Sequence, residues 1–401
     1  MSATQVRALC LCNVVIFIGI AAIVGVMPVY LAQLRAGATI TGLFLAFAYL
    51  CLALGTVLAG CLADRLQRRK TVLLVSGACA APLTWLLATI TAVLPLLVVV
   101  GCLWFVTGTA MALVPILTGL CAPPPERGRL FGRLTLSSGL GLLLGNLLSG
   151  PIVDRWGYPA LFVVLGLVAL GLPGASALAP DPGATPAPPA HVTRRTGAIL
   201  TQRPFLLLVG ASILGQAANI VIVLGRVLLM HTLHFPTTAI TIVAALGGIV
   251  TLPLPLLCGR MAERLGPKPV LIACFAGPPL GLLALASAQA LWQFWVASAL
   301  QTVLGASLVV GSALVSALVP AERRGTALAL LNATPWIGIV VGLSGGGLAI
   351  SLVQMRSTVL VSVLLSLVAL VALLPISPRQ PPRSATQPHD GAKAQAARSW
   401  Q

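Results

Sequence analysis

Polar side chains that could contact a solute interrupt an otherwise apolar run of the chain, residues 204–232. They are Gln216, Asn219 and Arg226. Asn219 and Arg226 are seven residues apart, about two turns of α-helix, so their side chains share one face, which Gln216 flanks. One positive charge and two amides suit reversible binding of a polar solute. Because Arg226 lies about two turns from the end of the run, its guanidinium either faces a cavity or extends to the water beyond that end.

Six more side chains in apolar runs are candidates for the same cavity, because amides can hydrogen-bond a solute and aromatic rings can stack on it. These candidates are Asn146, Gln301, Asn332, Tyr30, Tyr49 and Trp104. Catalytic chemistry is not indicated, since the runs hold no cluster of His, Asp and Glu and the chain has neither an H-E-x-x-H motif nor a phosphate-binding loop. Nine cysteines form no C-x-x-C pair. We therefore expect no enzyme activity, no metal site and no cofactor.

The elements that carry these residues are predicted to be membrane-spanning helices. Hydrophobic residues make up 58% of the 401 residues and charged residues only 8%, whereas a soluble domain carries roughly 25% charged residues. The apolar runs are continuous rather than alternating, which excludes a β-barrel, and about 20 helical residues cross a bilayer. The fold class is therefore all-α, with twelve transmembrane helices. The predicted spans are residues 8–31, 41–63, 71–90, 95–120, 131–153, 158–178, 204–232, 238–260, 269–288, 291–318, 326–349 and 355–376.

The basic residues predict how these spans are oriented. The chain has 24 Lys and Arg against 7 Asp and Glu, and 20 of the 24 fall in the termini and in alternate connections. The other connections hold only Arg35, Arg155 and Arg356. The positive-inside rule then places both termini of this multi-pass protein in the cytoplasm, and we expect a bacterial inner membrane. The net charge of +17 does not indicate nucleic-acid binding, because the basic residues lie at the ends of the spans. Nucleic acid is therefore excluded as a partner.

A polar, Pro-rich stretch divides the spans into two sets of six. The predicted units are an N-terminal half at 1–178, a cytoplasmic linker at 179–203, a C-terminal half at 204–376 and a disordered cytoplasmic tail at 377–401. The halves resemble each other: GCLADRLQRRKTVLL (60–74) aligns with GRMAERLGPKPVLI (259–272) at an offset of 199 residues. Parallel repeats of six spans are typical of one large class of transporters.

The first repeat resembles the best-known motif of the major facilitator superfamily, roughly G-x-L-A-D-R-x-G-R-R/K. The matching residues are Gly60, Leu62, Ala63, Asp64, Arg65, Arg68, Arg69 and Lys70, with Gln67 where the family usually has Gly. The resemblance covers residues 8–376 and implies that family's fold of two six-helix halves.

Asp64 is expected at the C-terminal end of the second span, where the helix dipole disfavours an anion, so its carboxylate should seek a cationic or amide partner. The resemblance implies that this partner is span eleven. It also implies that the motif, with the repeated Glu263 and Arg264, forms a cytoplasmic gate that latches the halves together in one state.

The same resemblance implies a secondary active transporter that moves a small organic solute across the lipid bilayer by alternating access, working as a monomer. Protons are the candidate coupling ion. The expected direction is efflux, because the motif pattern is nearest to the drug:proton antiporter-like members. The alternatives are uptake or facilitated diffusion of a small organic anion and, in another class, a membrane sensor that does not transport.

The acidic residues bear on the charge of that solute. All seven are expected in loops or at span ends, with none in the middle of the bundle. A cavity with one cation and no anion should favour neutral or anionic solutes over cations, because charges interact strongly where the dielectric constant is low.

Overall fold

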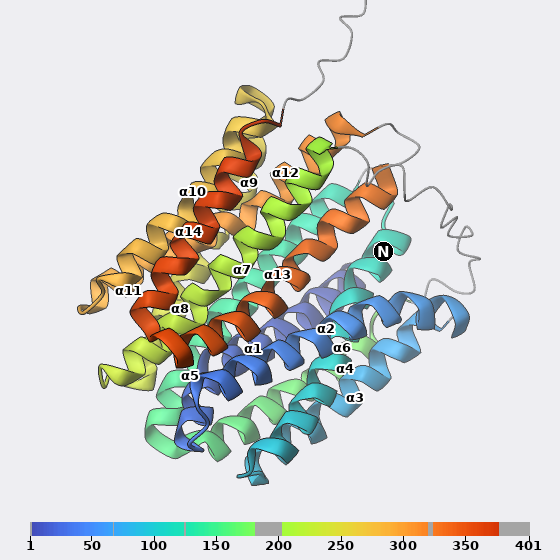
Figure 1. Cartoon of the computed structure of the whole chain (residues 1–401). Helices are drawn as coiled ribbons and strands as arrows, with labels where there is room; N and C mark the ends of the chain where they lie inside the picture. Colours follow the sequence, from blue (N-terminus) through green and yellow to red (C-terminus); the bar gives the residue numbers. More distant parts are fainter. Residues whose placement is uncertain (1, 67, 124–125, 181–202, 320–323, 377–401) are drawn as a thin grey trace, which may run out of the picture.

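The structure is a computed structural model that describes residues 2–66, 68–123, 126–180, 203–319 and 324–376 (Figure 1). The helices before the linker are α1 (Ala3–Gln33), α2 (Ala38–Leu66), α3 (Arg69–Leu86), α4 (Val93–Cys121), α5 (Arg127–Ala169) and α6 (Gly171–Ala177). Those after it are α7 (Arg203–Thr232), α8 (Thr237–Thr251), α9 (Leu254–Leu265), α10 (Pro267–Ala286), α11 (Leu291–Thr302), α12 (Ser307–Leu318), α13 (Arg324–Val353) and α14 (Met355–Leu373). Short 3-10 segments follow α3 and α11, at Leu87–Thr89 and Val303–Ala306.

Twelve crossings are present in the described part of the chain. Eleven helical stretches are long and apolar enough to cross a membrane, and one of them, Gly128–Ala177, has 50 residues. As one straight helix it would be roughly 75 Å long, more than twice the hydrocarbon core. Instead the chain turns inside α5 at Gly157, whose φ of 79° is readily adopted only by glycine. α5 therefore contains two spans, and the predicted fold class is confirmed.

Two predicted spans of the second half are not continuous helices. The span at 238–260 divides into α8 and α9, because Pro253 and Pro255 have no backbone N–H to continue the helical hydrogen bonds. The span at 291–318 consists of α11 and α12 with the 3-10 segment Val303–Ala306 between them. Irregular backbone at membrane depth is tolerated where it is buried in protein or lines a cavity.

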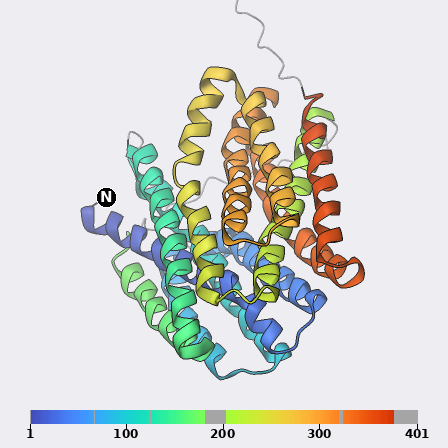
Figure 2. The same ribbon diagram turned by 90° about the vertical axis from the view of Figure 1, so that its left-hand side faces the viewer.

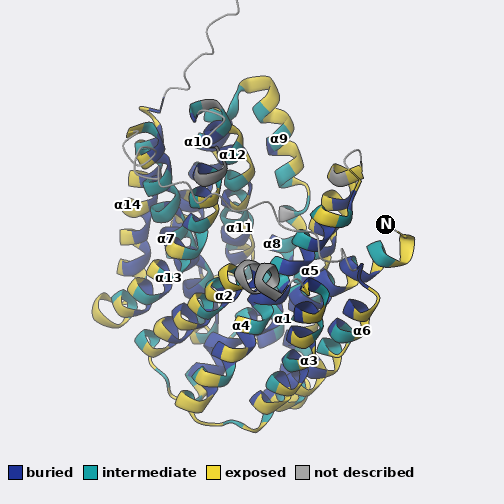
Figure 3. Cartoon of the chain, turned by 90° about the vertical axis from the view of Figure 1, so that its right-hand side faces the viewer, coloured by how far each residue is buried: buried dark blue, intermediate teal, exposed yellow. Residues whose placement is uncertain are grey.

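The helices form two groups, α1–α6 and α7–α14, which appear as separate bundles inclined to each other in Figures 1 and 2. α5 packs against α8, and α2 packs against α13, so these two pairs of helices join the groups. Buried residues lie where helices face one another and exposed residues on the outside (Figure 3). The exact division at 179–203 stays a prediction, because 181–202 lie outside the described residues, as does the predicted tail at 377–401.

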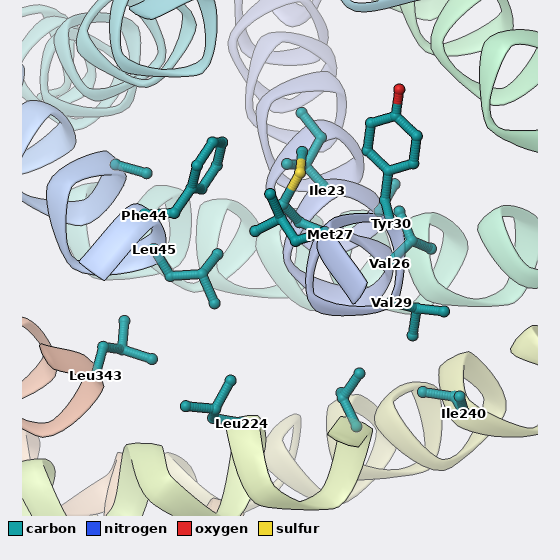
Figure 4. Close-up of a cluster of buried hydrophobic side chains, with 14 of the residues drawn as sticks. Ile23, Val26, Met27, Val29, Tyr30, Phe44, Leu45, Leu224, Ile240 and Leu343 are labelled. Carbon is teal, nitrogen blue, oxygen red and sulfur yellow. The ribbon is translucent and has the colours of Figure 1, made fainter. Parts of the chain in front are cut away.

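Among the residues whose side chains the structure describes, the hydrophobic core is shared by the two groups near one end of the bundle. We call the end with the Arg- and Lys-rich connections the basic end and the other the opposite end. Near the opposite end one cluster unites both groups, and Figure 4 shows Leu45 of the first group pointing toward Leu224 and Leu343 of the second. Toward the basic end each group has its own cluster, around Leu113 in one and Phe275 in the other.

Direct contacts also join the groups at the opposite end. The Thr39 hydroxyl of α2 donates to Ser351 Oγ of α13 over 2.7 Å. The Asp154 carboxylate of α5 accepts hydrogen bonds from the Thr237 and Thr238 amides, at 3.0 and 2.7 Å. These amides begin α8 and would otherwise lack partners within the helix. A carboxylate of one half thus caps a helix of the other.

This cap leads to a first prediction. Asp154→Ala should weaken closure of the opposite end by about 1 kcal/mol, the usual effect of removing a helix N-cap. The population open at that end should then rise about fivefold. Spin labels at positions 35 and 356, in a background without the native cysteines, would report the distance between the halves. An unchanged distance distribution in Asp154→Ala would show that the cap does not hold this end closed.

Close packing of α2 on α4 leads to a second prediction. A Cβ atom on Gly108 would collide with the Leu52 carbonyl, and one on Gly55 with the Phe105 carbonyl. Such small-residue contacts let membrane helices approach closely. We expect Gly108→Ala to destabilise the fold by about 1–3 kcal/mol. Gly210→Ala is the matched control, because a Cβ there meets no atom within 4 Å. Equal melting temperatures for the two variants would contradict this account.

Candidate functional site

A cavity of about 170 Å³, with several polar side chains in its wall, lies where the two groups meet. α5 supplies Leu142 and Asn146, α7 supplies Arg226, and α8 and α11 supply the remaining walls. The lining residues from α8 and α11 are Ala244, Gly247, Gly248, Ser298, Gln301 and Thr302. Three residues predicted from sequence, Asn146, Arg226 and Gln301, are therefore brought together from three different helices.

Arg226 is buried, with 4% of its surface exposed. Its Nη1 donates to Ser298 Oγ over 2.6 Å, and this hydroxyl in turn donates to the Val243 carbonyl over 3.1 Å. The chain of hydrogen bonds ties α7 to α11 and α8. The sequence left two positions open for this guanidinium. In the structure it lies at the cavity and does not extend to the water beyond the helix end.

Asn146 faces the cavity from the other half. Its Nδ2 donates to the Leu142 carbonyl one turn earlier, at 2.9 Å. Its Oδ1 lies over Gly25 of α1, where a Cβ atom would come within 3.1 Å of it. The glycine therefore leaves room for the amide, which is 7% exposed.

Sequence reasoning missed Ser298 and Thr302, because it considered only amides, arginine and aromatic rings. The available signal was their spacing: Ser298, Gln301 and Thr302 follow an i, i+3, i+4 pattern and so share one helix face. Gly247 was missed as well. A Cβ atom at this position would lie 3.0 Å from Ser298 Oγ, so glycine gives the hydroxyl space beside α8.

The other candidate residues lie outside the residues lining this cavity. Gln216 is half-buried and packs against α13. A Cβ atom added to Gly338 of α13 would lie only 2.6 Å from the Gln216 Cβ. Asn219 is half-buried on the same helix, and its Oδ1 has no hydrogen-bond partner among the described residues. Asn332 is exposed and donates to its own helix at the Leu328 carbonyl over 2.8 Å.

The aromatic candidates belong to two separate clusters. Tyr49 packs on Trp104, with ring centroids 4.8 Å apart, and Trp104 lines a small apolar cavity inside the first half. Tyr49 also lies 6.5 Å from Trp336 of the second half. Tyr30 packs on Tyr158 at 4.6 Å and donates to the Ile90 carbonyl. Its hydroxyl is thus occupied within the first half.

Comparison with known proteins identifies the family. The Major Facilitator Superfamily profile matches residues 9–253 and again 206–401, which together cover nearly the whole chain. The chain belongs to the Major Facilitator Superfamily. It is accordingly a multi-pass membrane transporter of small solutes, and the family indicates a transporter rather than an enzyme.

Individual members of the superfamily match this chain over short stretches. The chain is 33% identical over 90 residues to multidrug resistance protein MdtG of Salmonella choleraesuis (strain SC-B67), which covers 22% of each chain. It is 28% identical over 116 residues to the class B tetracycline resistance protein of Escherichia coli, 29% of each chain. These matches thus span less than a third of either relative.

Solved structures of the superfamily share the fold. The nucleoside transporter NupG superimposes with a TM-score of 0.75 at 14% identity, covering 94% of this chain and 99% of that one. The D-xylose-proton symporter gives 0.74 at 16% identity, with 94% and 98% covered. At such identities the likeness concerns the fold alone.

The superfamily motif is only partly visible. The structure describes Gly60, Asp64 and Arg65 as part of α2 but does not describe the side chains of Asp64 and Arg65. Arg68 is exposed between α2 and α3, and Arg69, at the start of α3, is buried. Glu263 and Arg264 are exposed near the end of α9. The gate between this motif and α13 therefore stays a prediction.

Proposed function

We propose that this chain exports a small organic solute from the cell by alternating access. One observation carries the proposal: among the described side chains the halves share a core near the opposite end and have separate cores toward the basic end, and the cavity with Arg226 and Asn146 lies where they meet. A carrier open on one side has this arrangement. The halves can rock about the shared region and expose the same cavity to either side.

Orientation follows from the charge bias. The basic end faces the cytoplasm, and both termini lie there, because Lys and Arg concentrate in cytoplasmic connections. We propose that the state described is the one open toward the cytoplasm, ready to load a solute from within. Its membrane is the bacterial inner membrane. We propose that one chain suffices for transport.

Relatives named for multidrug and tetracycline resistance support export, since removing a toxic solute gives resistance. Protons are the proposed coupling ion. The same fold would also serve uptake of an organic anion, so the assay has to distinguish export from uptake.

Two assays test this function. Purified protein in liposomes should exchange radiolabelled solute by counterflow, and an imposed proton gradient should accelerate net movement. Cells that produce the protein should accumulate less of that solute than cells with an empty vector. Greater accumulation would overturn export and favour uptake. Failure of counterflow with every solute that binds would indicate a sensor.

A further inference from the structure

The charge of Arg226 is held in place but not neutralised within the described residues. Its only hydrogen bond there joins Nη1 to the neutral Ser298 hydroxyl, and Nε is buried without a partner. None of the residues that line the cavity is acidic. The described carboxylates, Glu126, Asp154 and Glu263, belong to helix ends elsewhere.

An unpaired buried guanidinium is energetically unfavourable. Removing a charge from water costs several kcal/mol in real proteins unless a counter-charge or hydrogen bonds compensate for it. Charged residues inside a membrane bundle usually have such a partner or mark the path of a solute. Arg226 lines a cavity, so its missing partner can come from outside the chain.

The geometry favours one chemical class. Nη1 is bonded to Ser298, and Nε is buried without a partner among the described residues. A planar guanidinium offers pairs of parallel N–H groups, which match the two oxygens of a carboxylate. Asn146 and Gln301 add polar groups on the cavity wall, and Gly247 and Gly248 leave space beside them.

We propose that this cavity binds the carboxylate of a small organic anion through the guanidinium of Arg226. The inference rests on the proposed function and names the substrate class for the same site. A cavity of about 170 Å³ is smaller than the roughly 300–1,000 Å³ of drug-sized pockets, which restricts the bound portion to a small group.

Binding at this position would act on both halves. Arg226 belongs to α7 and Asn146 to α5, so a carboxylate solute between them contacts each group of helices. When the halves rock, these contacts change together. The solute therefore binds the two states with different affinity, which is what allows it to bias their equilibrium.

A matched series of probes tests the inference. Benzoate, benzamide and benzylammonium have similar size and differ in charge. Binding to purified protein is measured by calorimetry and by the shift in melting temperature, which a bound ligand raises. We expect benzoate to bind, and benzamide and benzylammonium to bind at least about 30-fold more weakly, the factor typical of losing a buried charge pair.

Variants locate the site. Arg226→Gln should weaken benzoate binding at least about 30-fold, and Arg226→Lys should also weaken it, because an ammonium cannot form the two parallel bonds. Arg356→Gln removes the same charge from an exposed position and should bind benzoate like the unaltered protein. Gel filtration and melting without ligand establish that the variants are folded.

The outcomes separate the two proposals. Equal binding of all three probes, tighter binding of benzylammonium, or undiminished binding by folded Arg226→Gln would overturn carboxylate recognition while leaving transport of another solute intact. Benzoate binding that depends on Arg226, together with failure of counterflow in liposomes for every solute that binds, would support the site and overturn the transport proposal.

Discussion

Oxidation of the double variant Thr39→Cys/Ser351→Cys is expected to stop transport. The two native hydroxyls are 2.7 Å apart, so cysteines there are close to the roughly 3.5–4.5 Å Cβ separation that a disulfide needs. The bond would join α2 to α13 at the opposite end. Since alternating access requires these helices to separate there, counterflow should fall about tenfold once roughly nine-tenths of the chains are cross-linked.

The controls for this variant use the same chain. Each single variant, oxidised in the same way in a background without the native cysteines, should transport normally. Adding a reductant to the cross-linked double variant should restore transport. Full activity of fully cross-linked protein would mean that the halves do not separate at this end.

Gly42→Leu should have the reverse effect and hold the opposite end open. A Cβ atom on Gly42 would collide with the Leu343 carbonyl and lie 2.8 Å from the Gly347 Cα. Overpacking of this kind costs about 1–3 kcal/mol, which corresponds to roughly 5- to 150-fold in the balance between closed and open states. We expect counterflow to fall on the order of tenfold, because the carrier would rarely return to the state described here.

The Gly42→Leu substitution should leave each half folded, since each half keeps its own core toward the basic end. Gly37→Leu is the matched control, because a Cβ atom there meets nothing within 4 Å. Spin labels across the opposite end should report a longer distance in Gly42→Leu and an unchanged one in Gly37→Leu. Normal counterflow by Gly42→Leu would show that this close approach of α2 and α13 has no part in the cycle.

Much of the fold could be predicted from sequence because the bilayer restricts the choices. Lipid requires helices, a fixed thickness sets their length, and the break between the fifth and sixth spans falls at Gly157. The division of the eighth span was missed. Proline is common enough in membrane helices that the presence of Pro253 and Pro255 does not by itself indicate a break.

The candidate site could be predicted less completely. Arg226, Asn146 and Gln301 do share one cavity, as expected for polar residues in a bundle. Asn332 and Tyr30 lie elsewhere, because a polar side chain can bond to a backbone carbonyl, here those of Leu328 and Ile90. Residue type and helix face follow from sequence, whereas helix tilt and crossing decide which faces meet.

Paired distance measurements at the two ends of the bundle test the central claim most directly. Spin labels at positions 35 and 356 report the opposite end, and labels at 133 and 260 report the basic end, each compared with and without benzoate. We predict reciprocal changes, with the basic end closing as the opposite end opens, and no such changes in Arg226→Gln. Distances that stay fixed at both ends while benzoate is transported, or that lengthen at both ends together, would contradict alternating access around this cavity.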